Sequence, residues 1–260
     1  MEIRNSTILI TGGTSGIGLE MVKQFTELGA KIIVTGRNLE MLYETQKKCP
    51  MVHVLQSDVS NPSDIEQLYT DVIQQFPELN IIVNNAGVMR LIDLEDTSVD
   101  LQNLVREIDI NLSGTIQMVH RFLPHLIKKD SAAIVNVSSA IAFMAYSSAP
   151  IYSASKAGVH AYTKALRLQL QKTNVKVFEV IPPGVNTNLQ QDWVLQPNPG
   201  QMMDVKKMVH AIARGISKNR TEITPGLSGV VKYMCRIAPD LIEKNLGHRE
   251  FEKFKQIKRQ

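Results

Sequence analysis

The feature that most constrains the fold of this chain is a short apolar segment that runs into a glycine-rich turn and then into an amphipathic helix. Residues 6–11 are mostly apolar and β-branched, which predicts a buried strand, and they lead directly into Gly12-Gly-Thr-Ser-Gly-Ile-Gly18. From Leu19 to Leu28 apolar residues recur at intervals of three and four, which predicts a helix. A strand, a glycine turn and a helix N-terminus together make a ready site for a phosphate group.

Three of these glycines have separate uses in such a site. Gly12 would allow the tight turn, Gly16 the close approach of a pyrophosphate, and Gly18 the tight packing of the helix on the strand. A glycine cluster alone also fits an ordinary strand-to-helix turn. Here the cluster lies between a predicted strand and a predicted helix, which is the context that a dinucleotide-binding motif requires.

Strands and helices are predicted to alternate along the rest of the chain. Further strands are expected at residues 31–35, 51–56, 80–84, 132–137, 175–181 and 221–224, and helices at residues 39–48, 62–76, 99–110, 114–129, 152–172 and 204–218. Such alternation implies right-handed crossovers and a parallel sheet that is covered by helices on both faces. We therefore predict a single-domain α/β fold, a Rossmann-type doubly wound parallel sheet in three α/β/α layers. It would span residues 1–225, with a C-terminal helical extension over residues 226–260.

Composition restricts the class of protein further. With 260 residues, 43% of them hydrophobic and 21% charged, the chain can bury a large core, which argues against a disordered protein. No apolar run reaches the roughly 18 residues of a spanning helix, and no secretory signal is visible at the N-terminus. Cys49 and Cys235 lie far apart, so we expect reduced thiols and a cytoplasmic location. The spacing of His120, His125 and His160 forms no plausible triad, so no metal site is predicted.

Tyr152 and Lys156 form the pair that points most directly to chemistry. Because they are four residues apart on a predicted helix, their side chains lie on one face, one turn apart. A phenol with a pKa of about 10 is a poor acid–base catalyst at neutral pH, whereas a nearby ammonium lowers that pKa. The pair therefore suits a tyrosine that passes a proton to and from a substrate oxygen. Taken alone, the same spacing also fits a packed ring and a solvated amine.

Six motifs follow one another along the chain. They are Thr11-Gly-Gly-Thr-Ser-Gly-Ile-Gly18, Asp58-Val59, Asn84-Asn-Ala-Gly87, Asn111-Leu-Ser-Gly114, Val137-Ser-Ser139 and Tyr152-Ser-Ala-Ser-Lys156. In this order and at this spacing they resemble the short-chain dehydrogenase/reductase family over about residues 5–225. Within that family the chain looks most like the DltE-type oxidoreductases of Gram-positive bacteria, on the stretches 84–93 and 181–187. The resemblance implies an oxidoreductase that transfers a hydride between a nicotinamide cofactor and a carbonyl or alcohol substrate.

By this resemblance, Asn111, Ser139, Tyr152 and Lys156 form the catalytic set. Ser139 would hydrogen-bond the substrate oxygen, and Tyr152 would donate the proton in reduction and accept it in oxidation. Lys156 would lower the pKa of the tyrosine and hold the nicotinamide ribose, and Asn111 would bind a water that relays protons to it. Ser138 would point the other way, because successive strand residues alternate faces. The alternative is a catalytically silent dinucleotide-binding sensor or scaffold that acts through its C-terminal tail, and the intact catalytic set argues against it.

Cofactor choice depends on the residues after the second strand. NAD sites usually place an acidic residue there to hold the ribose hydroxyls, but this chain has Thr35-Gly-Arg-Asn38. The planar, permanently charged guanidinium of Arg37 suits a phosphate and can also stack on adenine, so NADP is the preferred cofactor and NAD the alternative. Arg37 could instead be a solvated charge on a turn. The residues predicted to bind the cofactor are Gly12, Thr14, Ser15, Gly16, Ile17, Gly18, Arg37, Asp58, Val59, Asn85, Ala86, Gly87, Tyr152, Lys156, Pro182 and Thr187.

One departure from the family pattern lies near the expected nicotinamide. The family usually has Pro-Gly followed four residues later by Thr, whereas the register to Thr187 gives Pro182-Pro183, with Gly184 one place late. Proline fixes φ near about −65° and removes an N–H, so the local backbone must differ. Thr187 remains the expected contact of the nicotinamide amide.

A second departure lies near the expected substrate. Residues 140–150 lack the glycine that many relatives carry after Ser139, which predicts an apolar pocket with Phe143 and Met144 as candidate lining residues. Residues 188–201 contain the only tryptophan and are predicted to form a mobile loop that covers the substrate.

The C-terminal tail carries the charge imbalance of the chain. Residues 232–260 contain eight Lys or Arg and four Asp or Glu, which accounts for the whole net charge of +4 and does not indicate nucleic-acid binding by the fold. An apolar stripe at helical intervals, broken at Pro239, comprises Val230, Val231, Met234, Ile237, Ala238, Leu241 and Ile242. We favour packing of this apolar stripe on its own domain or a sister subunit over contact with an anionic membrane surface or a partner groove.

The expected partners are a small-molecule carbonyl or alcohol substrate and further copies of the chain. The resemblance implies a homodimer or homotetramer that associates through helices 114–129 and 152–172. The second of these is apolar on more than one side, so one side can face the sheet and another a partner helix. Deeper burial within one subunit is the alternative.

Overall fold

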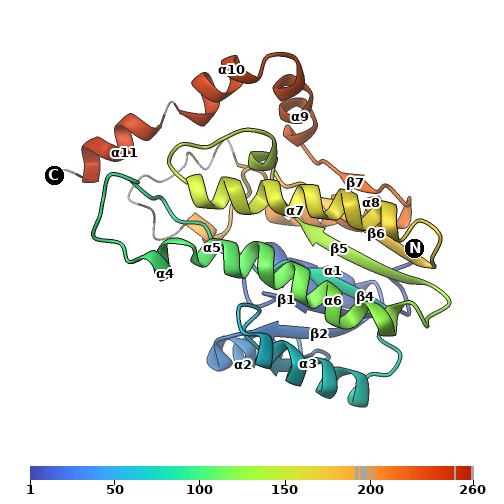
Figure 1. Cartoon of the computed structure of the whole chain (residues 1–260). Coiled ribbons are helices and arrows are strands. Elements are labelled where there is room, and N and C mark those ends of the chain that lie inside the picture. The colour runs from blue at the N-terminus through green and yellow to red at the C-terminus, as the bar shows by residue number, and fades with distance from the viewer. Residues whose placement is uncertain (191–192, 194–197, 199, 201, 249, 259–260) are drawn as a thin grey trace.

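Figure 1 shows the computed structural model of the chain, which describes residues 1–190, 193, 198, 200, 202–248 and 250–258. Within them a seven-stranded parallel sheet has the order β3-β2-β1-β4-β5-β6-β7. The strands are β1 Thr7–Thr11, β2 Lys31–Gly36, β3 His53–Gln56, β4 Ile81–Asn84, β5 Ala132–Val137, β6 Val175–Val180 and β7 Glu222–Ile223. The chain builds outward from β1 to β3 and then returns to β4 on the other side of β1, which is the reversal of a doubly wound sheet. The predicted Rossmann-type fold is confirmed.

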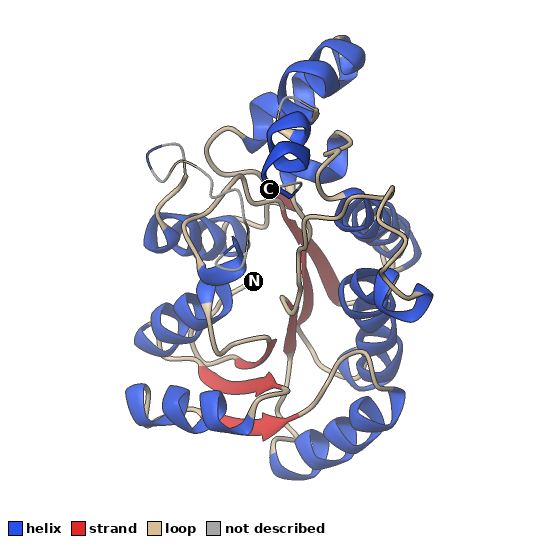
Figure 2. Ribbon diagram, turned by 90° about the vertical axis from the view of Figure 1, so that its left-hand side faces the viewer, coloured by secondary structure: helices blue, strands red, loops and turns tan. Residues whose placement is uncertain are grey.

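Helices cover both faces of this sheet (Figure 2). They are α1 Gly16–Glu27, α2 Leu39–Lys48, α3 Pro62–Gln75, α6 Gly114–Leu126, α7 Pro150–Gln169 and α8 Val205–Ser217. Ile8 and Ile10 of β1 pack in a cluster with apolar side chains of α1, α2 and α8, whereas Leu9 packs in a second cluster with those of α3, α6 and α7. Because successive strand residues alternate faces, a fully buried strand such as β1 requires both helical layers, as predicted.

The prediction of one helix over residues 99–110 is wrong. Helix α4, Leu101–Leu104, ends at Val105, where the backbone φ and ψ are −88° and 1°. The short helix α5, Arg106–Ile108, then leads into a π-helical turn, Asp109–Ser113, which continues directly into α6. A π-turn often marks a functional position, and here it carries Asn111.

The C-terminal extension lies beyond the β7 edge of the sheet and reaches with α11 to the side where the strands end (Figure 1). It comprises α9 Ser228–Ile237, α10 Pro239–Ile242, a π-helical turn Glu243–Gly247 and α11 Phe251–Lys258. The break at Pro239 is as predicted, because Ala238 precedes it in a non-helical conformation. Phe254 of α11 is 3% exposed, so this part of the extension is packed against the remainder of the chain.

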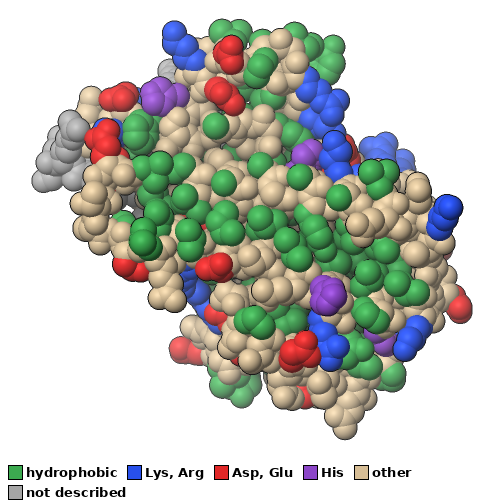
Figure 3. Space-filling model, in the orientation of Figure 1, with side chains coloured by type: hydrophobic (Ala, Val, Ile, Leu, Met, Phe, Trp, Pro, Cys, Tyr) green, Lys and Arg blue, Asp and Glu red, His purple; other side chains and the backbone are tan. Residues whose placement is uncertain are grey.

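Most of the apolar stripe does not pack against its own domain, which leaves packing on a sister subunit as the other part of the favoured interpretation. Val230, Met234, Ile237 and Leu241 are between 39% and 65% exposed, and only Ile242 is buried. Figure 3 shows hydrophobic side chains over α9 and α10, with acidic side chains among them and basic ones beside them. Their packing on a sister subunit remains a prediction. In the described part of the chain, no helix is long and apolar enough to cross a bilayer.

Candidate active site

A cavity of about 890 Å³ lies at the carboxyl ends of the strands. This is where doubly wound sheets bind their ligands. Every residue predicted to bind the cofactor lines this cavity, and so do Ser139, Tyr152 and Lys156. Asn111 is the one predicted site residue that does not line it.

The glycine turn after β1 forms one wall of the cavity, and its shape depends on glycine. Gly12 and Gly16 have positive φ angles of 64° and 53°, a conformation that side chains with a Cβ rarely adopt. A Cβ atom on Gly18 would lie 2.2 Å from the carbonyl oxygen of Gly12, so α1 could not approach the turn so closely with another residue. Ser15, the residue before α1, makes no side-chain cap, which leaves its hydroxyl available to a ligand.

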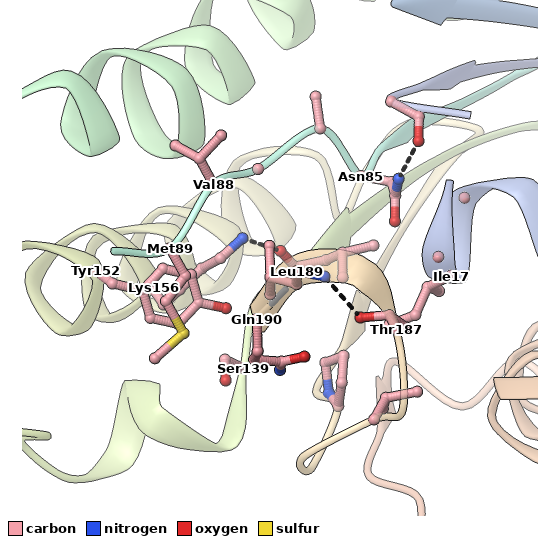
Figure 4. A pocket seen from close by; sticks show the side chains of 18 of the residues that line it. Ile17, Asn85, Val88, Met89, Ser139, Tyr152, Lys156, Thr187, Leu189 and Gln190 are labelled. Atoms are coloured by element: carbon pink, nitrogen blue, oxygen red, sulfur yellow. Dashed lines mark hydrogen bonds between the residues drawn. The ribbon is translucent and has the colours of Figure 1, made fainter. Parts of the chain in front are cut away.

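Polar side chains fasten this turn to the end of β4. The Thr11 hydroxyl oxygen accepts hydrogen bonds of 3.0 Å from the backbone N–H groups of Asn85 and Ala86. The Asn85 side-chain amide in turn donates to the carbonyls of Thr11 and Gly12, at 3.0 and 3.1 Å (Figure 4). Thr11 was not among the predicted site residues, because its role is to position the turn. The segment from Asn85 to Gly87 therefore has a fixed place opposite the glycine turn.

These features fit a dinucleotide. The glycines leave a cradle that a Cβ would fill, and the free N–H groups at the start of α1 suit a pyrophosphate. At the end of β2, Arg37 is exposed and lines the cavity, and its carbonyl is held by the Gln56 side chain at 2.9 Å. Asp58 accepts hydrogen bonds from the backbone and hydroxyl of Ser60, which orient its carboxylate beside Val59.

The predicted catalytic side chains lie together in the cavity (Figure 4). Tyr152 and Lys156, one turn apart on α7, are 6% and 4% exposed, and Ser139 follows the end of β5 and is 8% exposed. The Lys156 ammonium donates a 2.9 Å hydrogen bond to the carbonyl of Val137 and lies 5.7 Å from the centre of the Tyr152 ring. Ser138 also lines the cavity, and its hydroxyl donates to the buried Glu179 at 2.6 Å.

Burial dominates the electrostatics of this group. It raises the pKa of Tyr152 to about 12, with a smaller rise from the buried carboxylate of Glu107, while a hydrogen bond with Ser139 acts to lower it. Burial also lowers the pKa of Lys156 to about 8. The expected lowering of the tyrosine pKa by Lys156 is therefore not found in this structure, because removal from water penalises the phenolate and is the dominant effect on this pKa.

Asn111 acts on the site through the backbone. Its Oδ1 accepts from the Val88 N–H at 2.9 Å, and its Nδ2 donates to the Val88 carbonyl and to the Ser155 hydroxyl, both at 3.0 Å. A Cβ atom on Gly87 would lie 3.2 Å from the Asn111 side chain and 3.4 Å from the Lys156 ammonium, so Gly87 separates the two. The predicted water relay stays a prediction.

The end of the cavity beside Tyr152 is apolar. Met144 lines it as predicted, but Phe143 does not: its ring packs edge-on against His160 at 5.0 Å. Trp193, from the predicted loop 188–201, packs here and its indole N–H donates to the Met89 carbonyl at 3.3 Å. Residues 191–192, 194–197, 199 and 201 of that loop lie outside the described residues.

Several lining residues were missed by the sequence analysis. They are Met89, Ile141, Tyr146, Leu227, Val231 and Glu250, and three of them belong to the C-terminal extension. The motifs do not include them, and no spacing in the sequence connects the extension with Tyr152. Two signals in the sequence pointed to this end: the single tryptophan in the predicted substrate loop and the apolar segment after Ser139.

Comparison with known proteins identifies the family. Residues 6–198 match the family described as short chain dehydrogenase. The chain belongs to this family. It is 41% identical over 191 residues to the uncharacterized oxidoreductase DltE of Bacillus subtilis, covering 74% of this chain and 76% of that protein. It is 32% identical over 222 residues to an uncharacterized oxidoreductase of Staphylococcus aureus, covering 83% and 94%. The likeness to DltE-type oxidoreductases is thus confirmed.

Solved structures of the same fold include complexes with NADP and with NAD. A short chain dehydrogenase from Burkholderia cenocepacia in complex with NADP superposes with a TM-score of 0.81 at 24% identity, covering 95% of this chain and 99% of that one. A short chain dehydrogenase/reductase from Burkholderia phymatum in complex with NAD gives 0.82 at 21% identity, covering 94% and 96%. At these identities the comparison shows the fold.

Proposed function

We propose that this chain is an NADP-dependent oxidoreductase that interconverts a carbonyl compound and its alcohol, with Tyr152 as the general acid and base. The observation that carries the proposal is the convergence of Ser139, Tyr152 and Lys156 on one cavity that also contains the glycine cradle. A pure binding module needs the cradle and not the three polar side chains. Family membership and the likeness to relatives described as oxidoreductases support the same conclusion.

In the proposed reduction, the residues of this chain bind the carbonyl and deliver its proton. A bound nicotinamide supplies a hydride, with its two electrons, to the carbonyl carbon. The π electrons of the C=O bond move to the oxygen, to which the Ser139 hydroxyl donates a hydrogen bond. That oxygen takes the proton of the Tyr152 hydroxyl, and the positive charge of Lys156 compensates the phenolate that remains. The alcohol is the product, and oxidation follows the reverse course.

The preference for NADP rests on the end of β2. No acidic side chain is present in the segment from Thr35 to Asn38, and Arg37 lines the cavity there with an exposed guanidinium. The guanidinium group of arginine is planar and permanently charged, so it binds a phosphate well, whereas an acidic side chain in this place would repel it. NAD remains the alternative cofactor, bound without the phosphate contact.

The proposal is tested by Tyr152→Phe, assayed by nicotinamide absorbance on a panel of carbonyl compounds and alcohols with both cofactors. Loss of a general acid should lower turnover by at least ~10²-fold, with the fold and NADPH binding retained. Tyr162→Phe is the matched control, because Tyr162 lies on the same helix and does not line the cavity. Near-native activity of Tyr152→Phe would refute the mechanism. Tight NADPH binding without turnover of any compound would favour the sensor instead.

A further inference from the structure

The C-terminal extension is bound to the loop between Ser139 and Tyr152. In this joining loop, residues 140–149, the Tyr146 hydroxyl donates a hydrogen bond of 2.6 Å to the carboxylate of Glu250. Burial and this bond both raise the pKa of Tyr146, so the hydroxyl keeps its proton and remains the donor. A hydrogen bond to a carboxylate is roughly twice as strong as one between neutral groups. The extension thus holds the segment that connects Ser139 with Tyr152, the two residues whose hydroxyls are proposed to be catalytic.

A second contact joins the same segments through the backbone. The Ser147 N–H donates to the carbonyl of Gly247 at 2.9 Å, and the Ser147 hydroxyl lies 2.8 Å from Nδ1 of His248. A Cβ atom on Gly247 would lie 2.1 Å from the carbonyl oxygen of Ala145, which is far inside contact distance. The extension therefore meets the joining loop at a distance that only glycine permits.

The extension also forms part of the cavity wall. Leu227, Val231 and Glu250 line the cavity, and α9, which carries Val231, packs against the Ala140–Phe143 turn. Lys232 holds α9 in place, because its ammonium forms an ion pair with Glu222 of β7 and lies 5.6 Å from the centre of the Phe143 ring. The other apolar side chains at this end of the cavity are Met89, Ile141, Met144 and Trp193.

We propose that the C-terminal extension is part of the substrate site, where it holds the joining loop and completes an apolar wall that selects large apolar carbonyl compounds. This inference rests on the proposed function. A substrate with a long hydrocarbon tail would bury it against Val231, Met144 and Trp193. Burial of one methylene corresponds to roughly fourfold in affinity. A small polar carbonyl compound reaches none of these side chains and gains nothing from the extension.

Selectivity is tested with butanal and octanal as substrates and NADPH as the reductant. Wild-type protein should prefer octanal in kcat/KM, and Val231→Asp should lower kcat/KM at least tenfold for octanal while that for butanal changes little. Val230→Asp is the matched control, because the neighbouring Val230 is 52% exposed and does not line the cavity. The same octanal-to-butanal ratio in both variants would overturn the proposed wall.

Binding is tested separately from turnover with 1-octanol and tryptophan fluorescence. Trp193 is the only tryptophan of the chain and lines the cavity, so its emission reports on occupancy there. Octanol should shift the tryptophan emission of the wild type and of Val230→Asp at similar concentrations. The same shift in Val231→Asp should need at least tenfold more octanol. Octanol binding without reduction of any aldehyde would sink the proposed function and support the wall. No emission change in the wild type would overturn the wall itself.

The hold on the joining loop is tested by hydrogen exchange in Glu250→Ala. Exchange over residues 140–149 should become at least tenfold faster, and adding Tyr146→Phe should have no further effect, because the two groups form one bond. Glu252→Ala, at an exposed position of α11, should match the wild type. Unchanged exchange in Glu250→Ala would refute the contribution of the extension to loop order.

Discussion

Replacement of Lys156 by methionine should change how the stability of the chain depends on pH. The lysine side chain is 4% exposed, and burial lowers its pKa from 10.5 to about 8. In the unfolded chain the amine is in water and has its ordinary pKa of about 10.4. Between these two values the unfolded state binds more protons than the folded state, so the contribution of Lys156 to stability rises with pH. Below about pH 8 the buried ammonium destabilises the folded state by its full amount.

The size of this effect follows from the two pKa values. Each pKa unit is worth about 1.4 kcal/mol, so a fall from 10.5 to about 8 costs the folded wild type about 3 kcal/mol at neutral pH. Between pH 7 and pH 10 about 2.5 kcal/mol of this cost should disappear. The 2.9 Å hydrogen bond from Lys156 to the Val137 carbonyl offsets part of this cost in the wild type. Loss of this hydrogen bond in Lys156→Met changes the free energy of unfolding by the same amount at every pH. It leaves the pH-dependent difference between the two proteins unchanged.

Urea unfolding at pH 7, 8, 9 and 10 measures this difference directly. The free energy of unfolding of Lys156→Met relative to wild type should fall by about 2.5 kcal/mol across this range. Tyr152, whose pKa is raised to about 12, loses stabilisation as pH rises above about 10, but it does so in both proteins and cancels. Lys164→Met, at an exposed position of α7, should run parallel to the wild type. Parallel curves for Lys156→Met and wild type would show that the buried ammonium carries no such cost.

Three further outcomes are expected. Arg37→Ala should weaken NADPH binding about 10- to 150-fold, as for the loss of one charged hydrogen bond, and NADH binding much less in fluorescence titrations; equal losses would mean that the arginine stacks on adenine. Gly18→Ala should lower the melting temperature and NADPH affinity, because its Cβ would lie 2.2 Å from the Gly12 carbonyl, whereas Gly184→Ala, with no atom within 4 Å, should not. We expect the chain to dimerise through the apolar face over α6 and α7 (Figure 3), which light scattering would detect. Leu168→Glu, which changes a side chain that is 69% exposed, should yield monomers. A monomeric wild type at micromolar concentration would count against this interface.

The fold could be predicted because its signals are local. Apolar runs such as the strand at Ile81–Asn84 and the three-to-four periodicity of α1 fix the type of each element, and their alternation fixes the sheet. The course of residues 99–110 could not be predicted in the same way. Asn111 bonds the backbone of Val88, which is distant in sequence, and no local pattern encodes that contact.

In the candidate site too, features encoded by local sequence could be predicted, and features that depend on contacts between distant segments could not. Residues carried by motifs, such as Tyr152 and Asn85, line one cavity because the motifs specify their positions on strands and helices, and their roles there stay predictions. The pKa of Tyr152 was not predictable, because it depends on how completely the folded chain removes the phenol from water. Tyr146 and Glu250 are 104 residues apart in the chain, and their bond forms only because the C-terminal extension returns to the joining loop.

Burial of Tyr152 also bears on the direction of the proposed reaction. With a pKa of about 12, the phenol carries its proton at neutral pH and can donate it to a substrate oxygen without prior ionisation. Oxidation instead needs the phenolate, which burial disfavours. Lys156 can offset this effect only while it is charged, and with a pKa of about 8 it begins to lose its proton just where a more basic medium would help the tyrosine ionise. Burial therefore keeps Tyr152 in the protonated form that the proposed reduction uses at neutral pH.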